Sequence, residues 1–482
     1  MSKPVKIALV SGGGLLGLLV VAGLGVVLFA DANAYKPQME AAASQALGME
    51  VKIDGPVGIG LFPGLVVTLR DLHVRAHGVE VVTIDEARLR IGVWSLLRKQ
   101  LEIETLALKH PTLLVEQAAD GSYALVQGTA PGGNPSASSL GRVTLADGGF
   151  RYVDKHSGNE VDADGCDVDI RALQLAAGKP SDILRGLGFT AVLACRTLRD
   201  GLYVATDIKA VANARQGLIT LAPIGLQLFG VKGNGSFRAD YSGAVPGYAL
   251  RFSLPQFQIA EFFKTLSAQD VAAGRMDFSM QLGFRGTATA DMTRSLAGRF
   301  SLRGKDLTLK GRDLDAEFSR FESSQHFNLV DLGALFFAGP IGLVVTKGYN
   351  FANVLRGPAG SSAIPVLVSD WKIQQGVAQP QDVALTTKLH RLALTGRLDF
   401  NSGKFDAVTL ALIDPQGCAI VKQRITGSFL QPVVEQPNFI VALTGPVLKL
   451  IKMGRDLFPG GECEVFYAGS VAAPAPASIG TH

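Results

Sequence analysis

Residues 276–284 read MDFSMQLGF, and this stretch carries the pattern on which the fold depends. Met276, Phe278, Met280, Leu282 and Phe284 alternate with aspartate, serine, glutamine and glycine. Successive side chains of a β-strand point to opposite faces of a sheet. The stretch therefore predicts a strand with one apolar and one solvated face.

The same period of two recurs elsewhere in the chain. It appears at residues 87–93 and in two further series, Leu392, Leu394, Leu398 and Phe400, and Val408, Leu410 and Leu412. Turn signals separate such stretches and predict antiparallel hairpins, at residues 54–55, 120–121, 147–149, 234–235 and 401–403. Helices are expected to be few, at residues 32–47 (ended by Gly48), 94–99, 255–266, 328–337 and 441–453.

An uncharged stretch of 24 residues, Ile7–Ala30, follows two lysines at the N-terminus. A helix of this length spans a hydrocarbon core of about 30 Å, and the flanking lysines favour a cytoplasmic N-terminus. We expect an uncleaved signal anchor, with the bulk of the chain on the other side of the membrane. A cleaved signal peptide is the alternative, because residues 30–32 resemble a cleavage site.

Composition and motifs argue against several classes of function. A net charge of +4 without a basic cluster, and 7% aromatic residues, give nucleic-acid binding little support. The seven histidines form no zinc pattern, and neither a nucleophile elbow nor a phosphate-binding loop occurs. The acidic run 162–169 has the residue types of a calcium site, but its alternation favours the solvated face of a strand. We therefore expect no enzyme activity, catalytic residue, metal or cofactor.

Four cysteines fall into two pairs along the chain. Disulfides between Cys166 and Cys195 and between Cys418 and Cys463 are the simplest pairing in an oxidising compartment. Four cysteines allow three connectivities, and buried free thiols are an equal alternative.

The N-terminal region resembles a known family. Residues 48–55 read GMEVKIDG, 61–63 read LFP, and 96–103 read LLRKQLEI, before Asp120-Gly121 closes the region. This order over residues 1–125 resembles the AsmA family of bacterial envelope proteins. A looser resemblance covers residues 328–356, 396–400 and 463–471. The resemblance implies a protein of the inner membrane that acts in outer-membrane biogenesis and lipid homeostasis. It also implies an architecture similar to bridge-like lipid transfer proteins, and it brings no catalytic residues.

These observations together predict the organisation of the chain. We expect a mostly β protein with a few helices, in which an N-terminal transmembrane helix precedes an elongated, curved antiparallel β-sheet that forms an apolar groove. The expected parts are a cytoplasmic N-terminus (1–6), the anchor (7–30), an AsmA-like N-terminal module (31–126), a Gly/Pro/Ser-rich linker (127–139), a middle β-groove region (140–325), an AsmA-like C-terminal region (326–471) and a disordered tail (472–482).

An apolar sheet face can be buried against a second sheet or can hold a ligand. If the apolar face holds a ligand, we expect the groove to bind and conduct phospholipid or lipopolysaccharide-related lipid. The residues expected to line it are Met276, Phe278, Met280, Leu282, Phe284, Leu392, Leu394, Leu398, Phe400, Val408, Leu410 and Leu412. Ordinary core positions are the alternative for each of them. Two rival functions are a scaffold or chaperone-like factor for outer-membrane protein assembly and protein targeting to the membrane, and a periplasmic hydrolase with dispersed carboxylates. The oligomeric state stays open.

Overall fold

The computed structural model describes residues 32–60, 64–92, 103–119, 138–175, 184–265, 270–321, 360–435, 438–439 and 465–474. The predicted anchor (7–30) and the helices expected at 94–99, 328–337 and 441–453 lie outside the described residues. Within the described ranges, no helix has the length and apolar character that crossing a membrane requires. The chain divides into two compact units, Met1–Ile219 and Thr220–His482, and the expected linker lies within the first.

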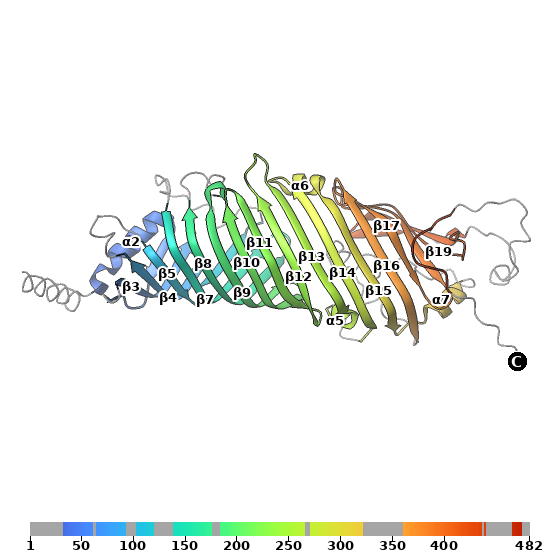
Figure 1. Cartoon of the computed structure of the whole chain (residues 1–482), viewed down its shortest axis with the longest axis horizontal. Coiled ribbons are helices and arrows are strands. Elements are labelled where there is room, and N and C mark those ends of the chain that lie inside the picture. The colour runs from blue at the N-terminus through green and yellow to red at the C-terminus, as the bar shows by residue number, and fades with distance from the viewer. Residues whose placement is uncertain are drawn as a thin grey trace, which may run out of the picture. The chain divides into compact units, whose positions relative to one another are not determined.

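The described residues are mostly β, as predicted (Figure 1). The strands of the first unit are β1 (Glu50–Ile53), β2 (Gly58–Gly60), β3 (Leu65–Ala76), β4 (Val79–Ile91), β5 (Ile103–Lys109), β6 (Thr112–Gln117), β7 (Ser138–Asp154), β8 (Asn159–Leu175), β9 (Gly188–Asp200) and β10 (Tyr203–Arg215). Strand β11 (Leu218–Leu228) contains the division between the units. The second unit continues with β12 (Val231–Asp240), β13 (Gly247–Gln258), β14 (Ala272–Arg285), β15 (Ala297–Lys310), β16 (Ser361–Gln374), β17 (Val377–Thr386), β18 (Arg391–Asp399), β19 (Lys404–Ile413), β20 (Ala419–Ser428), β21 (Gln431–Val434) and β22 (Asn438–Phe439).

The described part of the first unit begins with the predicted helix, which the structure divides into a 3₁₀ turn η1 (Ala32–Tyr35) and α2 (Lys36–Leu47). Gly48 ends α2 in the left-handed conformation (φ 67°), as its position predicted. Met49 and Ala43 pack against a buried cluster that includes Val51 and Val74 of β1 and β3. This contact attaches α2 to the sheet.

The sheet of the first unit is mixed, which corrects the expectation of antiparallel pairing throughout. β7 pairs in parallel with both β5 and β6, whereas its other neighbour, β8, is antiparallel. β5 and β6 both pair with β4 on one side and with β7 on the other. Pro111 lies between them, and proline has no backbone N–H to donate to a neighbouring strand. Turn signals alone did not reveal that the chain after β6 returns to begin β7 in the same direction.

In the second unit each strand from β12 to β20 pairs antiparallel with the next, as predicted for a meander. Among the described residues of this unit, three short helices lie between strands: α5 (Ile259–Lys264), α6 (Thr289–Ser295) and α7 (Leu314–Phe321). The helix expected at 255–266 is shorter, because β13 continues to Gln258 and a bulge between Leu254 and Phe257 buries both side chains.

Two predicted turns are wrong. Residues 234–235 lie inside β12, and residues 147–149 lie inside β7. In β12 the small residues make room for the ring of Phe252 on the neighbouring strand β13. A Cβ added at Gly233 would lie 2.9 Å from this ring. In β7 the residues typical of a turn form a bulge within the strand, where Asp147 has a positive φ of 52°. The turn predicted at 401–403 does join β18 to β19.

A bulge at Ala407 shows how the long strands keep their apolar residues on one face. Ala407 (φ 51°) is an extra residue of β19 against both β18 and β20. It brings Phe405 and Val408 to the same face although three positions separate them. Gly396 of β18 faces the bulge with φ 104°, and a Cβ there would lie 2.5 Å from the Ala407 carbonyl oxygen.

The opposite face of β16–β20 is covered by residues 465–471, which we call the C-terminal strap. Tyr467 and Val471 pack there against a buried cluster that includes Ala384, Ala393 and Ala411. Arg391, only 7% exposed, donates from Nη1 to the Val471 carbonyl oxygen at 2.9 Å. The strap is therefore held by apolar packing and by a buried cation.

Asp382 of β17 is the second anchor of the strap. Its Oδ1 accepts a hydrogen bond from the Tyr467 hydroxyl at 2.5 Å, and its Oδ2 accepts from the Ser470 backbone N–H at 3.0 Å and hydroxyl at 2.5 Å. Burial opposes ionisation of Asp382, but the hydrogen bonds from Ser470 and Tyr467 outweigh it and lower its pKa. The strap therefore closes on a carboxylate.

Candidate functional site: an apolar sheet face

The apolar residues of the second unit form continuous rows across neighbouring strands. One row runs through Phe252, Met280, Phe300 and Trp371, which are direct partners on β13 to β16. A second runs through Leu367, Leu385, Leu392 and Leu412 on β16 to β19. Because directly paired residues point to the same side, these strands share one face, which we call the apolar face.

The structure brings the residues predicted to line a groove to this apolar face. The five residues of β14 from Met276 to Phe284, the three leucines of β18, and Val408, Leu410 and Leu412 of β19 all point to this side by register. Phe400 follows the end of β18, and its ring lies 5.9 Å from that of Phe429. Segments more than a hundred residues apart in sequence therefore contribute to one surface.

Burial divides the twelve predicted residues into two groups. Eight are at most 9% exposed, as core residues are: Met276, Phe278, Leu392, Leu394, Leu398, Val408, Leu410 and Leu412. The helix α5 packs on β14, and its Phe262 and Phe263 are 4% and 2% exposed. The other four, Met280, Leu282, Phe284 and Phe400, are half-buried. Only these four retain surface for a ligand.

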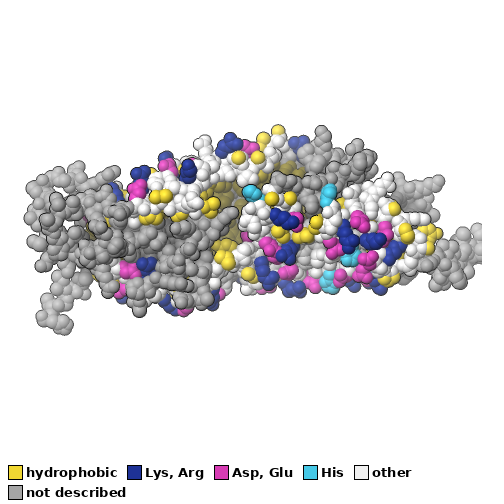
Figure 2. Space-filling model, turned by 180° about the vertical axis from the view of Figure 1, so that it is seen from behind, with side chains coloured by type: hydrophobic (Ala, Val, Ile, Leu, Met, Phe, Trp, Pro, Cys, Tyr) yellow, Lys and Arg dark blue, Asp and Glu magenta, His cyan; other side chains and the backbone are white. Residues whose placement is uncertain are grey.

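Three of the half-buried residues belong to a larger group, which we call the open patch. It consists of Phe237, Tyr248, Leu250, Phe252, Met280, Leu282 and Phe284, all half-buried on β12, β13 and β14. The sequence reading missed its β12 and β13 members, although residues 248–254 (YALRFSL) show the same alternation as β14. Figure 2 shows hydrophobic side chains lining a recess on the rear side of the molecule.

Aromatic rings give the open patch a defined edge. The Tyr248 ring lies 5.0 Å from Phe284 and 6.5 Å from Phe237, both in stacked orientations. Burial, together with a hydrogen bond to Tyr241, raises the pKa of Tyr248 to about 12. The hydroxyl therefore stays uncharged at neutral pH, and the patch presents apolar rings with a polar tip, as tyrosines at membrane interfaces do.

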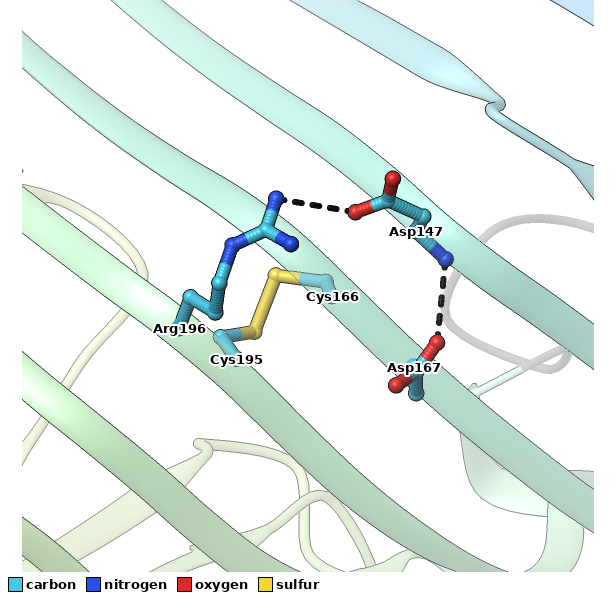
Figure 3. The surroundings of a disulfide bond; sticks show 5 residues. All are labelled: Asp147, Cys166, Asp167, Cys195 and Arg196. Carbon is cyan, nitrogen blue, oxygen red and sulfur yellow. Dashed lines mark hydrogen bonds and ion pairs between the residues drawn. A yellow bond between two sulfur atoms is a disulfide. The ribbon is translucent and has the colours of Figure 1, made fainter.

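The predicted cysteine pair lies in the first unit. Cys166 of β8 and Cys195 of β9 are direct cross-strand partners and form a disulfide (Figure 3). Beside it, Arg196 donates to Asp147 at 2.9 Å, and Asp167 accepts from the Asp147 backbone N–H at 3.0 Å. Cys418 is also disulfide-bonded, and Cys463 lies outside the described residues.

The acidic run of β8 is matched by arginines from adjacent strands. Asp169 accepts from Arg142 of β7, and Asp164 pairs with Arg199 of β9 at 3.3 Å. In the part of the chain that the structure describes, no group of three or more His, Cys, Asp or Glu side chains is arranged to hold a metal ion. The ion pairs between these aspartates and arginines are typical of the solvated face of a sheet.

Comparison with known proteins bears on the N-terminal part of the chain. No curated protein matches the sequence significantly. The model of the AsmA family matches residues 1–179, which extends the matched region beyond residue 125, where the sequence motifs end. The matched region ends in the first unit, so the open patch lies outside it. The model match over residues 1–179 confirms the resemblance to the AsmA family that the sequence motifs indicated.

Proposed function

We propose that this protein binds membrane lipids on its apolar face and conducts them as part of outer-membrane biogenesis and lipid homeostasis. In this proposal residues 7–30 anchor it in a bacterial inner membrane, with the N-terminus in the cytoplasm and the bulk of the chain in the periplasm. The lipid is a phospholipid or a lipopolysaccharide-related molecule. Binding and transfer involve no chemical step and no cofactor, so the protein is not an enzyme.

The open patch is the observation that carries the proposal. Its residues are apolar and continuous over three paired strands, yet they remain half-buried where their neighbours Met276 and Phe278 are buried. Contiguous apolar surface of this kind marks binding sites in folded proteins. Met280 adds a flexible, polarisable side chain that adapts to a mobile ligand. Acyl chains match these properties.

Energetics explain why such a surface serves lipid movement. An acyl chain that leaves a bilayer for water loses about 0.8 kcal/mol per CH₂ group, or on the order of 12 kcal/mol for about 16 carbons. An apolar face removes most of this cost while the headgroup stays in water. The open patch extends over the three neighbouring strands β12, β13 and β14, whereas Phe300 and Trp371, which continue its row, are only 3% and 2% exposed. Within the open patch a lipid could therefore change position without full exposure to water.

Photocrosslinking in the full chain tests this proposal. Phe284 is replaced by p-benzoylphenylalanine, an aromatic replacement at a half-buried position, in bacterial cells grown with radioactive phosphate. The matched control places the same crosslinker at Ala249, an exposed residue of the neighbouring strand β13 that points to the opposite face. We expect labelled lipid on the protein after illumination at position 284 and none at position 249.

A second variant tests whether the apolar patch itself holds the lipid. Leu282→Asp, half-buried beside Phe284, should abolish crosslinking at 284 while leaving the thermal unfolding midpoint of the protein close to that of the parent. Equal labelling at 284 and 249, or labelled lipid at neither, would contradict the proposal. An outer-membrane polypeptide crosslinked at 284 in place of lipid would favour the scaffold function.

A further inference from the structure

The face of the second unit that points away from the open patch carries a row of basic and amide side chains. Arg251, Gln281, Arg299, Lys372 and Gln379 are successive direct partners on β13 to β17. All five are exposed. We call this set the cationic row. It is independent of the lipid proposal, because its residues alternate along each strand with those of the apolar face.

The two central cations of the row face each other. Arg299 and Lys372 are direct partners across β15 and β16, and like charges in this position destabilise a sheet. Among the residues that the structure describes, neither of them forms an ion pair, and Arg299 donates only to the neutral Gln281 Oε1 at 3.0 Å. An anion placed between them would relieve this repulsion.

A carboxylate of the same strand as Lys372 is already paired with another arginine. Asp370 of β16 accepts from the Ser301 hydroxyl at 2.5 Å and from Arg303 Nε at 3.3 Å. Its side chain is only 19% exposed, and hydrogen bonding to Asp370 raises the pKa of Arg303. The Asp370 carboxylate is thus paired with Arg303, and it does not compensate the positive charges of Arg299 and Lys372.

A hollow lies at the same place. It has a volume of about 700 Å³, and its lining includes Gln281, Arg299, Ser301, Lys372 and Gln381. Arg299, Lys372 and the glutamines supply guanidinium, ammonium and amide donors, which phosphate oxygens accept from. Asp370 and Arg303 also line the hollow, and the Ser301 hydroxyl donates to Asp370. A hollow of this size suits a small ligand or a headgroup better than the broad surface of a folded protein.

We propose that the hollow binds a ligand that carries two or more phosphate groups. Arg251 and Lys372 lie three strand spacings apart, or about 14 Å at 4.8 Å per strand, so a single phosphate cannot contact both of these cations. One phosphate lies between Arg299 and Lys372, and a second reaches toward Arg251. The ligand is either a soluble polyphosphorylated compound or the headgroup of a phosphorylated lipid.

Calorimetric titration of the full chain in a neutral detergent tests the site. The probe is inorganic tripolyphosphate, with inorganic monophosphate for comparison. A second arm measures binding to phosphatidylcholine vesicles with and without phosphatidylinositol 4,5-bisphosphate, whose headgroup carries more than one phosphate. We expect tripolyphosphate to bind more tightly than monophosphate, with an affinity that falls as salt rises. Binding only to the vesicles that contain the bisphosphate lipid would identify a lipid headgroup as the source.

A double variant and a matched control make the test specific. Arg299→Gln with Lys372→Gln should weaken binding at least about tenfold. Lys209→Gln with Arg215→Gln removes the same charge from exposed positions of β10 in the first unit and should leave the affinity within about twofold. Because Arg299→Gln with Lys372→Gln removes a like-charge contact, its thermal unfolding midpoint should not fall. A parent that binds neither probe, or a double variant that binds as the parent does, overturns the proposal.

Discussion

Release of the C-terminal strap by Asp382→Asn is the prediction that the structure defines most closely. The asparagine carboxamide has only one oxygen that accepts hydrogen bonds. Its NH₂ group takes the place of the second carboxylate oxygen and cannot accept a hydrogen bond. If the oxygen faces Ser470, the Tyr467 hydroxyl loses its acceptor, and the converse orientation loses both bonds from Ser470. A hydrogen bond to a charged group contributes about 1.5–3 kcal/mol, and the bonds that remain become neutral. Since Ser470 is exposed, we expect a loss of about 2–3 kcal/mol.

The assay is amide hydrogen exchange of the peptide that covers residues 465–474 in the full chain. Local opening that becomes easier by about 2–3 kcal/mol should speed exchange by about 30- to 140-fold. The Val471 N–H, which donates to the Tyr467 hydroxyl at 3.0 Å, is the most informative position. Peptides of the first unit should exchange as in the parent.

The effect also has a defined dependence on pH. The pKa of Asp382 is lowered in the folded protein, so its stabilising contribution is complete above the unfolded value of about 3.9. It is lost as the pH falls through the lowered, folded-state pKa. The difference in exchange between the parent and Asp382→Asn should therefore be full at pH 7 and should shrink below about pH 4.

Asp406→Asn is the matched control. Asp406 pairs with Arg397 on β18 and β19, but both side chains are about half exposed, and such pairs contribute less than about 1 kcal/mol. Exchange of the strap should not change in this variant. The reasoning is refuted if Asp382→Asn and Asp406→Asn give the same exchange rates for residues 465–474, or if the effect of Asp382→Asn is independent of pH.

Three further changes test packing, crosslinking and backbone geometry. Leu392→Ala, at a position with 0% exposure, should cost about 2–5 kcal/mol in urea denaturation, and a loss below 1 kcal/mol would show that the row is loosely packed. Replacing Cys166 and Cys195 by serine opens a cross-link of sequence separation 29 and should cost about 3.5 kcal/mol, measured by circular dichroism during denaturation, unless the unfolded chain stays compact. Gly396→Ala should cost at least about 2 kcal/mol, because a Cβ meets the backbone of Ala407; an unchanged melting temperature would mean that the bulge can shift.

The sequence predicted local structure well where the signal lies within one element. The end of α2 at Gly48 and the strand at residues 276–284 follow from left-handed glycine geometry and from period-two alternation. It failed where a distant neighbour decides the conformation. Residues 234–235 have turn chemistry, yet they form part of β12 because Gly233 and Gly235 make room for the Phe252 ring of another strand.

The candidate sites were predictable to different degrees. Alternation identified which side of β14 is apolar, but nothing local distinguishes the half-buried Leu282 from the buried Phe278. Their difference depends on what packs over each end of the strand. The cationic row was not predictable, because Arg299 and Lys372 become neighbours only through the register of β15 and β16, whose sequences are separated by residues 311–360. Register is a property of the assembled sheet.

The bulge at Ala407 has a consequence for how this sheet tolerates changes in length. Since Ala407 is extra to both neighbouring strands, its deletion would restore even pairing and leave Phe405 and Val408 on the side they now occupy. Deletion of Thr409, two residues later, would instead turn Leu410 and Leu412 toward the opposite side of the sheet. Insertions and deletions in a lineage of such chains should therefore accumulate at bulged positions, where the number of residues in a strand can change without exchanging its two surfaces.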